Sequence, residues 1–204
     1  MTSLNLREKQ KRNTQLEITK TAMSLFTGHG FDNVPVALIC ERAGISRATF
    51  FNYFPQKHMI LAAVGTSRIE AMQSLLHSHL TLRHKVKLRH VVSLFLEFCE
   101  ENEQMGEQSR GLALQVLMHP VSRSSYVELT KRFTAALAEV LSELRGSGLL
   151  RGDPAVVAES MFSLYVGTTL EWLMDPSLKR GWLSKTMKVR LQLAADGFDP
   201  GKRR

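Results

Sequence analysis

The sequence contains little of what most enzyme and metal sites require. Only two of its 204 residues are cysteines, Cys40 and Cys99, and they form neither a CxxC pair nor a Cys/His cluster. This spacing excludes a cysteine-based zinc site and favours a reducing compartment. The chain also has no Gly-rich phosphate loop, HExxH motif or nucleophile motif. We therefore expect a protein that is not an enzyme and that has no metal and no cofactor.

Long apolar runs are missing as well. No stretch reaches the ~18 consecutive apolar residues of a membrane span, and the polar, basic start of the sequence lacks the apolar core of a signal peptide. We expect a cytoplasmic protein without a membrane partner. No segment alternates apolar and polar residues with period two, which argues against a sheet.

Basic residues, in contrast, are in excess. The chain has 27 Lys and Arg against 19 Asp and Glu, which gives a formal net charge of +8. Such a balance is typical of proteins with a polyanionic partner, either a nucleic acid or an acidic membrane surface. Many basic proteins merely carry solvated lysines, so the charge alone does not decide between these alternatives.

Apolar residues recur at helical spacing throughout the chain, which predicts an all-α fold of about nine helices. Thr14 with Glu17 forms a capping-box pattern at the start of the first helix. Asp153 with Pro154 predicts a later helix start, since Asp suits the cap and Pro the first turn. The predicted organisation is a flexible basic arm, a helix-turn-helix domain, a helical ligand-binding and dimerisation domain and a disordered tail, over residues 1–13, 14–60, 61–197 and 198–204.

The most informative segment is the pair of short helices at about residues 35–54. Gly44 lies in the tight turn between them and tolerates positive φ, while Cys40 is small enough for the second helix to cross closely. Apolar residues that lock the two helices together are Ile39, Ala43, Ile45 and Phe50. The face of the second helix that does not pack against the first is polar or amphipathic. A helix that contacts base edges and phosphates needs such a face.

Four aromatic residues fall within five positions of this second helix. We expect Phe50 and Phe54 to form the apolar centre of the small domain, and Pro55 to end the helix. The role of Phe51 stays open. We therefore interpret the aromatic residues mainly as packing residues that hold the second helix in place. The candidate contact residues lie between them.

The segment FDNVPVALICERAGISRATFFNYFPQKHMIL resembles the DNA-binding domain of the TetR family of bacterial transcriptional regulators. The resemblance covers about residues 12–65, while the remainder is similar only in being helical and of suitable size. The matching motifs are Gly30-Phe31, Ile39-Cys40-x-x-Ala43-Gly44-Ile45-Ser46 and Arg47-x-Thr49-Phe50-Phe51-x-Tyr53-Phe54-x-x-Lys57.

The resemblance implies double-stranded operator DNA as the partner. Arg47 is expected to bind a guanine edge in two-pronged fashion or a phosphate instead, and Ala48 to touch a thymine methyl. Lys57, at the start of the next helix, is expected to bind phosphate together with the helix N-terminus. The complete set of expected DNA contacts is Ser46, Arg47, Ala48, Thr49, Asn52, Tyr53 and Lys57.

Three positions depart from the family pattern. Pro35 stands where a threonine is usual, so a hydroxyl that could cap the helix and touch phosphate is missing. Phe51 replaces a usual tyrosine, and Cys40 replaces alanine. We expect the phosphate contacts to shift toward Tyr53, Lys57 and the N-terminal arm.

The resemblance also implies a homodimer and a small-molecule site in the helical remainder. The two last helices are expected to pair with their counterparts in a four-helix bundle, through Val157, Met161, Leu164, Gly167, Thr168, Leu183, Met187 and Leu191. A possible apolar or amphipathic effector is expected to contact Phe95, Phe98, Gln115, Met118, Met161, Phe162, Tyr165 and Trp172.

The sequence thus predicts a homodimeric, sequence-specific DNA-binding regulator, with release of a repressor by its effector as the leading hypothesis. An activator or a ligand-independent regulator of the same family is one alternative. The other is a helical protein-interaction module that has lost DNA binding, for which the missing hydroxyls at Pro35 and Phe51 are the only support.

Overall fold

The computed structural model describes residues 3–81, 87–104, 107–118 and 120–201. Within these ranges the protein is all-α with nine helices, which confirms the predicted fold class. In chain order the helices are α1 (Ser3–His29), α2 (Val36–Ala43), α3 (Arg47–Tyr53), α4 (Met59–Thr81), α5 (Leu88–Glu103), α6 (Glu107–Met118), α7 (Pro120–Gly146), α8 (Pro154–Met174) and α9 (Trp182–Phe198).

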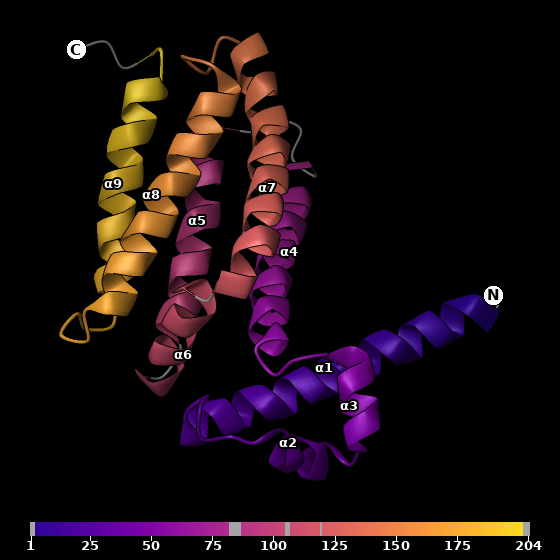
Figure 1. Ribbon diagram of the computed structural model, residues 1–204. Coiled ribbons are helices and arrows are strands. Elements are labelled where there is room, and N and C mark those ends of the chain that lie inside the picture. Colours follow the sequence, from indigo (N-terminus) through magenta and orange to yellow (C-terminus); the bar gives the residue numbers. More distant parts are fainter. Residues whose placement is uncertain (1–2, 82–86, 105–106, 119, 202–204) are drawn as a thin grey trace.

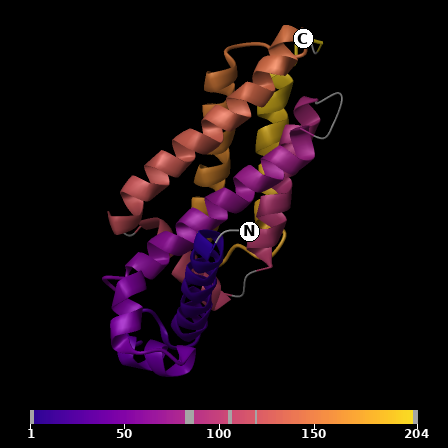
Figure 2. The same cartoon turned by 90° about the vertical axis from the view of Figure 1, so that its right-hand side faces the viewer.

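The helices form a small N-terminal group, α1–α3, at one end of a larger bundle (Figure 1). Helix α4 runs from the small group up into the bundle (Figure 2). Its first turn places Ile60 and Leu61 in the N-terminal core, whereas Ile69 and Met72 belong to the core of the bundle. The predicted domain boundary at residue 60 therefore falls inside a helix that both cores share.

The first helix is longer than the capping-box pattern predicted. It begins at Ser3, and the Thr14 hydroxyl donates to the carbonyl of Gln10 at 3.0 Å, a bond within the helix rather than a cap. Residues 3–13 of the predicted flexible arm are therefore helical; residues 1–2 lie outside the described part. The segment before Thr14 contains no Gly or Pro and is rich in Arg, Glu, Lys and Gln, all good helix formers, so nothing in it ends the helix.

The chain end also differs from the prediction. Phe198 still belongs to α9, and its carbonyl accepts a hydrogen bond from the N–H of Arg151 at 2.6 Å. Gly201 N–H donates to the Asp199 carboxylate at 2.8 Å in the turn that follows. Residues 198–201 of the predicted disordered tail are thus ordered, and residues 202–204 lie outside the described part.

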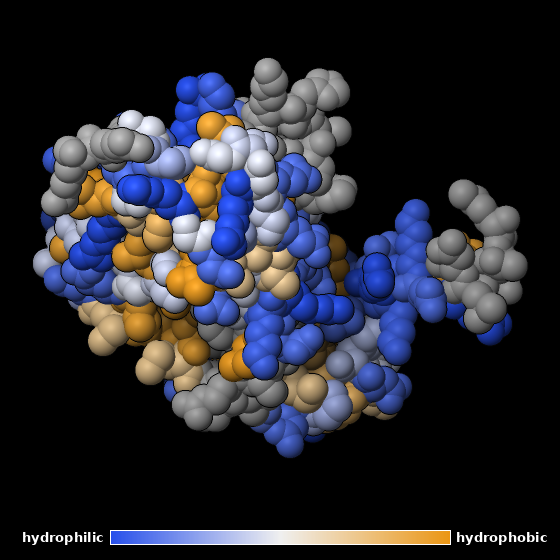
Figure 3. Space-filling model, turned by 90° about the horizontal axis from the view of Figure 1, so that it is seen from above, coloured by the Kyte–Doolittle hydropathy of each residue, from blue (hydrophilic) through white to orange (hydrophobic). Residues whose placement is uncertain are grey.

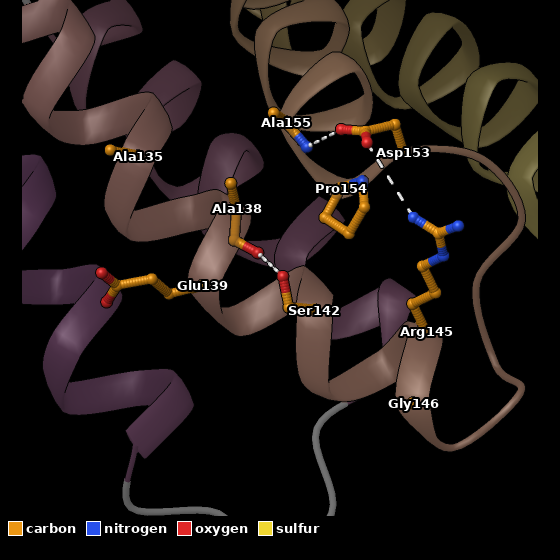
Figure 4. A pocket seen from close by; sticks show the side chains of 9 residues that line it. All are labelled: Ala135, Ala138, Glu139, Ser142, Arg145, Gly146, Asp153, Pro154 and Ala155. Carbon is orange, nitrogen blue, oxygen red and sulfur yellow. Dashed lines mark hydrogen bonds and ion pairs between the residues drawn. The ribbon is translucent and has the colours of Figure 1, made fainter.

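The predicted start of α8 is confirmed. The Asp153 carboxylate accepts hydrogen bonds from the N–H groups of Ala155 at 2.8 Å and Val156 at 3.4 Å, and Pro154 occupies the first turn. This cap borders a surface hollow between α7 and α8 (Figure 4). Across it, Arg145 approaches Asp153 at 3.9 Å, an exposed pair that contributes little to stability.

Helix α6 connects the two cores. Leu112 on one side of it is buried in the N-terminal core. Arg110 is also buried, and its guanidinium donates to the carbonyls of Trp172, Asp175 at 2.9 Å and Leu178 at 3.2 Å. The guanidinium lies 4.1 Å from the centre of the Trp172 ring. Arg110 therefore satisfies the Trp172 carbonyl near the end of α8, for which the residue four positions on, Pro176, has no N–H. It also adds a donor to the Asp175 carbonyl, which accepts from Leu178 N–H at 3.2 Å as well.

A second buried polar residue secures the next helix. Gly181 at the N-cap of α9 has no side chain that could cap it. The Glu103 carboxylate, from the end of α5, accepts hydrogen bonds from Leu183 N–H at 2.8 Å and from the Ser184 hydroxyl at 2.6 Å. Glu103 and Arg110 thus hold both ends of the α8–α9 connection. Among the described residues, no helix is long and apolar enough to cross a membrane.

Candidate DNA-binding site

The turn between α2 and α3 has the geometry that its glycine predicts. Gly44 adopts φ 64° and ψ 34°, the left-handed region in which side chains are disfavoured. Its N–H donates to the carbonyls of Cys40 and Glu41, and the N–H of Ile45 donates to Cys40 at 3.0 Å. These bonds close α2 and direct the chain into α3.

Ser46 is the N-cap of α3. Its Oγ accepts a hydrogen bond from the N–H of Thr49 at 3.0 Å and lies 2.9 Å from the Thr49 hydroxyl. A helix as short as α3 depends on such a cap because few of its backbone groups pair internally. Ser46 therefore has a structural role beside the DNA contact predicted for it.

The aromatic residues divide as the sequence predicts. Phe50 and Phe54 are buried in the N-terminal core, with ring centroids 6.0 Å apart. Phe51 packs edge-on against Phe50 at 5.4 Å but remains 46% exposed. It is therefore available at the surface of the site, although it has no hydroxyl to offer a phosphate.

The remaining candidate residues lie together on the outer side of α3. Arg47, Ala48 and Asn52 are exposed, whereas Thr49 and Tyr53 are half-buried. Among the described residues no carboxylate lies within salt-bridge distance of Arg47. The structure thus presents a free guanidinium, a free amide and a small side chain on one exposed helix face, as groove binding requires.

Lys57 is placed differently from the prediction. Its ammonium donates to the carbonyls of Phe31 at 2.8 Å and Val34 at 3.1 Å, and it lies 4.3 Å from the centre of the Phe31 ring. Helix α4 begins at Met59, so Lys57 also precedes it. Lys57 fixes the loop before α2 against the start of α4, which gives it a positioning role; the phosphate contact predicted for it stays a prediction.

The start of α2 lacks a side-chain cap, as expected from Pro35. Pro35 is the N-cap residue, and it provides no side-chain hydrogen bond. Only its carbonyl takes part, accepting from Leu38 N–H at 3.1 Å. The phosphate contact that a hydroxyl at this position would supply must come from elsewhere.

The predicted effector residues separate into two groups. Gln115 and Met118 are exposed on α6. The other six lie in the core of the bundle: Phe95, Phe98, Met161, Phe162, Tyr165 and Trp172. The rings of Phe95, Phe98 and Phe162 each contact the ring of Tyr165.

Sequence reasoning missed the polar residues inside this cluster. Asn102 Nδ2 donates to the Tyr165 hydroxyl at 3.2 Å, and both side chains are buried. Thr169 Oγ1 and Trp172 Nε1 are buried without a hydrogen-bond partner among the described residues. Helical spacing could have revealed Asn102, which lies four and seven residues beyond Phe98 and Phe95 on the same face.

The structure corrects the predicted dimer interface. Only Leu164 and Gly167 of the eight residues reach the outer side of the bundle. The other six are buried against the protomer's own helices: Val157, Met161, Thr168, Leu183, Met187 and Leu191. The periodicity of α8 identified its apolar face, and that face packs inward against the protomer's own bundle.

A different set of residues is exposed on the last two helices. We call it the α8–α9 outer face. On α8 these residues follow helical spacing, and two further apolar side chains lie on α9. Val156, Met174, Val189 and Leu193 are each more than half exposed. The face consists of Val156, Ser160, Ser163, Gly167, Met174, Val189 and Leu193.

Comparison with known proteins agrees with this arrangement. Residues 18–64 match the family model described as bacterial regulatory proteins, tetR family. A Mycobacterium tuberculosis protein assigned to the transcriptional regulation of mycofactocin biosynthesis, MftR, is 23% identical over 192 residues, 94% of each chain.

Two solved structures share the whole fold. The Thermus thermophilus repressor FadR, in complex with lauroyl-CoA, is 24% identical with a TM-score of 0.69, over 90% of this chain and 94% of its own. NalD of Pseudomonas aeruginosa, the secondary repressor of the MexAB-OprM multidrug efflux pump, is 18% identical with a TM-score of 0.68, over 95% of this chain and 100% of its own.

The family model spans α2, the Gly44 turn and α3, where the exposed face lies, and the structural likeness extends over the bundle. Members of this family are transcription factors rather than enzymes. Residues 18–64 therefore match the helix-turn-helix domain of the tetR family of bacterial regulatory proteins, and the chain as a whole shares the fold of FadR and NalD.

Proposed function

We propose that the protein is a homodimeric repressor that a small apolar or amphipathic effector releases from its operator. The observation that carries the DNA-binding part is the outer face of α3, with Arg47 exposed and unpaired beside Ala48 and Asn52. Two such faces on one two-fold axis would contact adjacent half-sites, which a single short helix cannot do with useful affinity.

The six buried residues of the predicted effector set support a site inside the bundle. Their aromatic rings would surround an apolar ligand body, and Thr169 Oγ1 and Trp172 Nε1 offer polar groups that nothing in the described part satisfies. Such groups are expected to gain a partner when a ligand with an acceptor atom binds. FadR, whose structure contains lauroyl-CoA, supplies an analogy for an amphipathic ligand.

Release would follow from a shift between two conformations of the dimer. A ligand in the bundle stabilises the conformation to which it binds more tightly, and the spacing of the two α3 helices changes with it. Helix α6 supports this coupling, because Arg110 holds the end of α8 while Leu112 lies in the N-terminal core.

The test of DNA reading is Arg47→Ala, compared with Arg47→Lys, on a duplex enriched from a random pool. If Arg47 binds a guanine bidentately, both variants lose about 1–3 kcal/mol per half-site, since lysine cannot reproduce the fork. If Arg47 binds phosphate, the lysine variant stays near wild type. Binding unchanged in both variants would contradict a direct role for Arg47; helix content by circular dichroism checks the fold.

The repressor assignment is tested by transcription from a promoter that carries the enriched duplex. Addition of the protein should lower transcript levels. An increase would favour the alternative of an activator, and absence of any duplex binding would favour the protein-interaction module.

A further inference from the structure

The N-terminal half of α1 lies beside the recognition helix instead of hanging free. Arg7, Lys11 and Thr14 lie on one face of α1, at intervals of four and three residues. They line a surface hollow whose other wall is α3. We call this hollow the α1–α3 groove, and its lining is Arg7, Gln10, Lys11, Asn13, Thr14, Thr49, Asn52 and Tyr53.

The charged side chains of the α1–α3 groove are all positive. It contains two cations and no carboxylate. Within the described part of the chain, neither Arg7 nor Lys11 has an acidic partner in salt-bridge distance. Free cations that converge with neutral polar side chains indicate an anionic ligand that also accepts hydrogen bonds.

The neutral residues of the groove are rich in free donors. The side-chain amides of Gln10 and Asn52 and the Tyr53 hydroxyl form no hydrogen bond within the described residues. Thr14 is different, because its hydroxyl proton is held by the Gln10 carbonyl. The groove therefore offers amide and phenol donors beside the two charges.

The position of the groove identifies the source of the anion. Asn52, Tyr53 and Thr49 belong both to the groove and to the face of α3 proposed to enter the DNA major groove. In Figure 1, α1 projects beyond α3, and the projecting part is mainly hydrophilic in Figure 3. A helix seated in the major groove has a sugar-phosphate strand at its edge, which is where α1 lies.

We propose that the α1–α3 groove binds the phosphodiester backbone of one DNA strand, with Arg7 and Lys11 as its phosphate ligands and Gln10, Asn52 and Tyr53 as supporting donors. The proposal rests on the proposed DNA binding and adds a second, sequence-independent contact surface to it. It also supplies phosphate contacts in place of the hydroxyls that Pro35 and Phe51 lack.

The rigid placement distinguishes this surface from a mobile basic arm. One helix, α1, carries Arg7 and Lys11 and also packs Ile18 and Ala22 into the N-terminal core. The two cations are separated by ~6 Å along the helix axis, within reach of neighbouring phosphates of one strand. The backbone that carries Arg7 and Lys11 is already ordered in the folded protein, so little conformational entropy is lost when DNA binds.

The test compares an Arg7→Ala/Lys11→Ala double variant with Lys9→Ala/Arg12→Ala. The control removes the same charge from the same helix, from residues that do not line the groove. All four positions are exposed on α1, and alanine is the best helix former, so both variants should fold. Affinity is measured between about 50 and 200 mM salt on the enriched duplex and on a scrambled duplex of the same composition.

The groove variant should lose affinity for both duplexes by the same factor, with an unchanged ratio between them. Each lost phosphate contact makes the slope of log affinity against log salt concentration shallower by ~0.9. A dimer of the groove variant loses four such contacts. Between about 50 and 200 mM salt, its affinity should therefore fall by a factor on the order of 100 times smaller than that of the wild type. The control variant should keep most of the slope, and Arg7→Lys/Lys11→Arg should restore it.

Equal slopes for the groove and control variants would overturn the proposal and leave only a general effect of charge. Loss of discrimination between the two duplexes in the groove variant would also overturn it, since it would make Arg7 or Lys11 a base-reading residue. If wild-type protein binds neither duplex at low salt, the proposed function itself fails, a result distinct from both.

Discussion

Replacing Arg110 by alanine is expected to lower the free energy of unfolding by about 3–5 kcal/mol, the largest loss we predict for a single polar residue. The substitution leaves the buried Trp172 carbonyl without its donor and removes the guanidinium donor from the part-buried carbonyls of Asp175 and Leu178, of which Asp175 keeps the N–H of Leu178. It also removes the group stacked on the Trp172 ring. Urea unfolding at fixed protein concentration measures the change.

Two controls separate this effect from a loss of charge. Arg145→Ala removes an exposed guanidinium whose only described ion pair, with Asp153, has a separation of 3.9 Å, and should change stability by less than about 1 kcal/mol. Arg110→Lys keeps the charge but not the planar fork, so its stability should fall between wild type and Arg110→Ala. Equal stability of the Arg110→Ala and Arg145→Ala variants would refute the clamp at the end of α8.

The same region contains a carboxyl group whose pKa is shifted, that of Asp175. Hydrogen bonds from the Ser177 hydroxyl and N–H lower the pKa of Asp175, and the Arg110 charge acts in the same direction. A carboxylate with a lowered pKa stabilises the fold above its unfolded-state pKa, and the contribution disappears as the pH falls through the folded-state value. Because Asp175 is fully exposed, this contribution is secondary to the clamp itself.

Gly167→Arg is expected to convert the proposed dimer into monomers and to weaken operator binding by at least ~100-fold, since the two DNA-binding domains are then no longer linked. A side chain at Gly167 meets nothing within 4 Å in its own protomer. Arginine there is also a better helix former than glycine. The protomer should therefore stay folded while the arginine occupies the space that the partner's helix needs. Sedimentation measures the mass.

Gly111→Arg on α6 is the matched control. Its added side chain likewise meets nothing within 4 Å, but Gly111 is far in sequence from the α8–α9 outer face. It should remain dimeric. Leu193→Asp, at a residue 69% exposed on α9, offers an independent variant of the outer face that should also be monomeric. If both outer-face variants stay dimeric, the interface lies elsewhere on the molecule.

Hydrophobic side chains do reach the surface on the side of the molecule away from the projecting helix (Figure 3). On α8 the residues assigned to this face between Val156 and Met174, namely Ser160, Ser163 and Gly167, are small, which allows close approach of another helix. The exposed Glu171, which pairs with Arg190 at 2.8 Å, lies between Gly167 and Met174 and would border the contact. Isologous pairing through this face would relate the two α3 helices by a two-fold axis. We propose this face as the dimer interface in place of the buried set that the sequence predicted.

The local chemistry of the helix-turn-helix was predictable because neighbouring residues determine it. Gly44 adopts the left-handed conformation, Ser46 caps α3, and Phe50 is buried, all within seven residues. Lys57 was not predictable in this way. Its partners, the carbonyls of Phe31 and Val34, lie 26 and 23 residues earlier, and only the folded chain brings them to the ammonium.

Helix α8 shows a second limit of sequence patterns. Val157 and Met161 face the core, whereas Val156 and Gly167 face outward, and apolar or small residues occupy both sides. Periodicity finds such a helix but does not say which side its own bundle covers. The burial of Arg110 was likewise hidden, since its partners are carbonyls whose position depends on where α8 ends.

The central claim, that this chain is a two-fold symmetric reader of duplex DNA, is tested most directly by selection of bound duplexes from a random pool at low salt. The account predicts an enriched palindrome whose half-sites are separated by about one helical turn or a multiple of it. Binding to no duplex, or enrichment of a motif without two-fold symmetry, would contradict it.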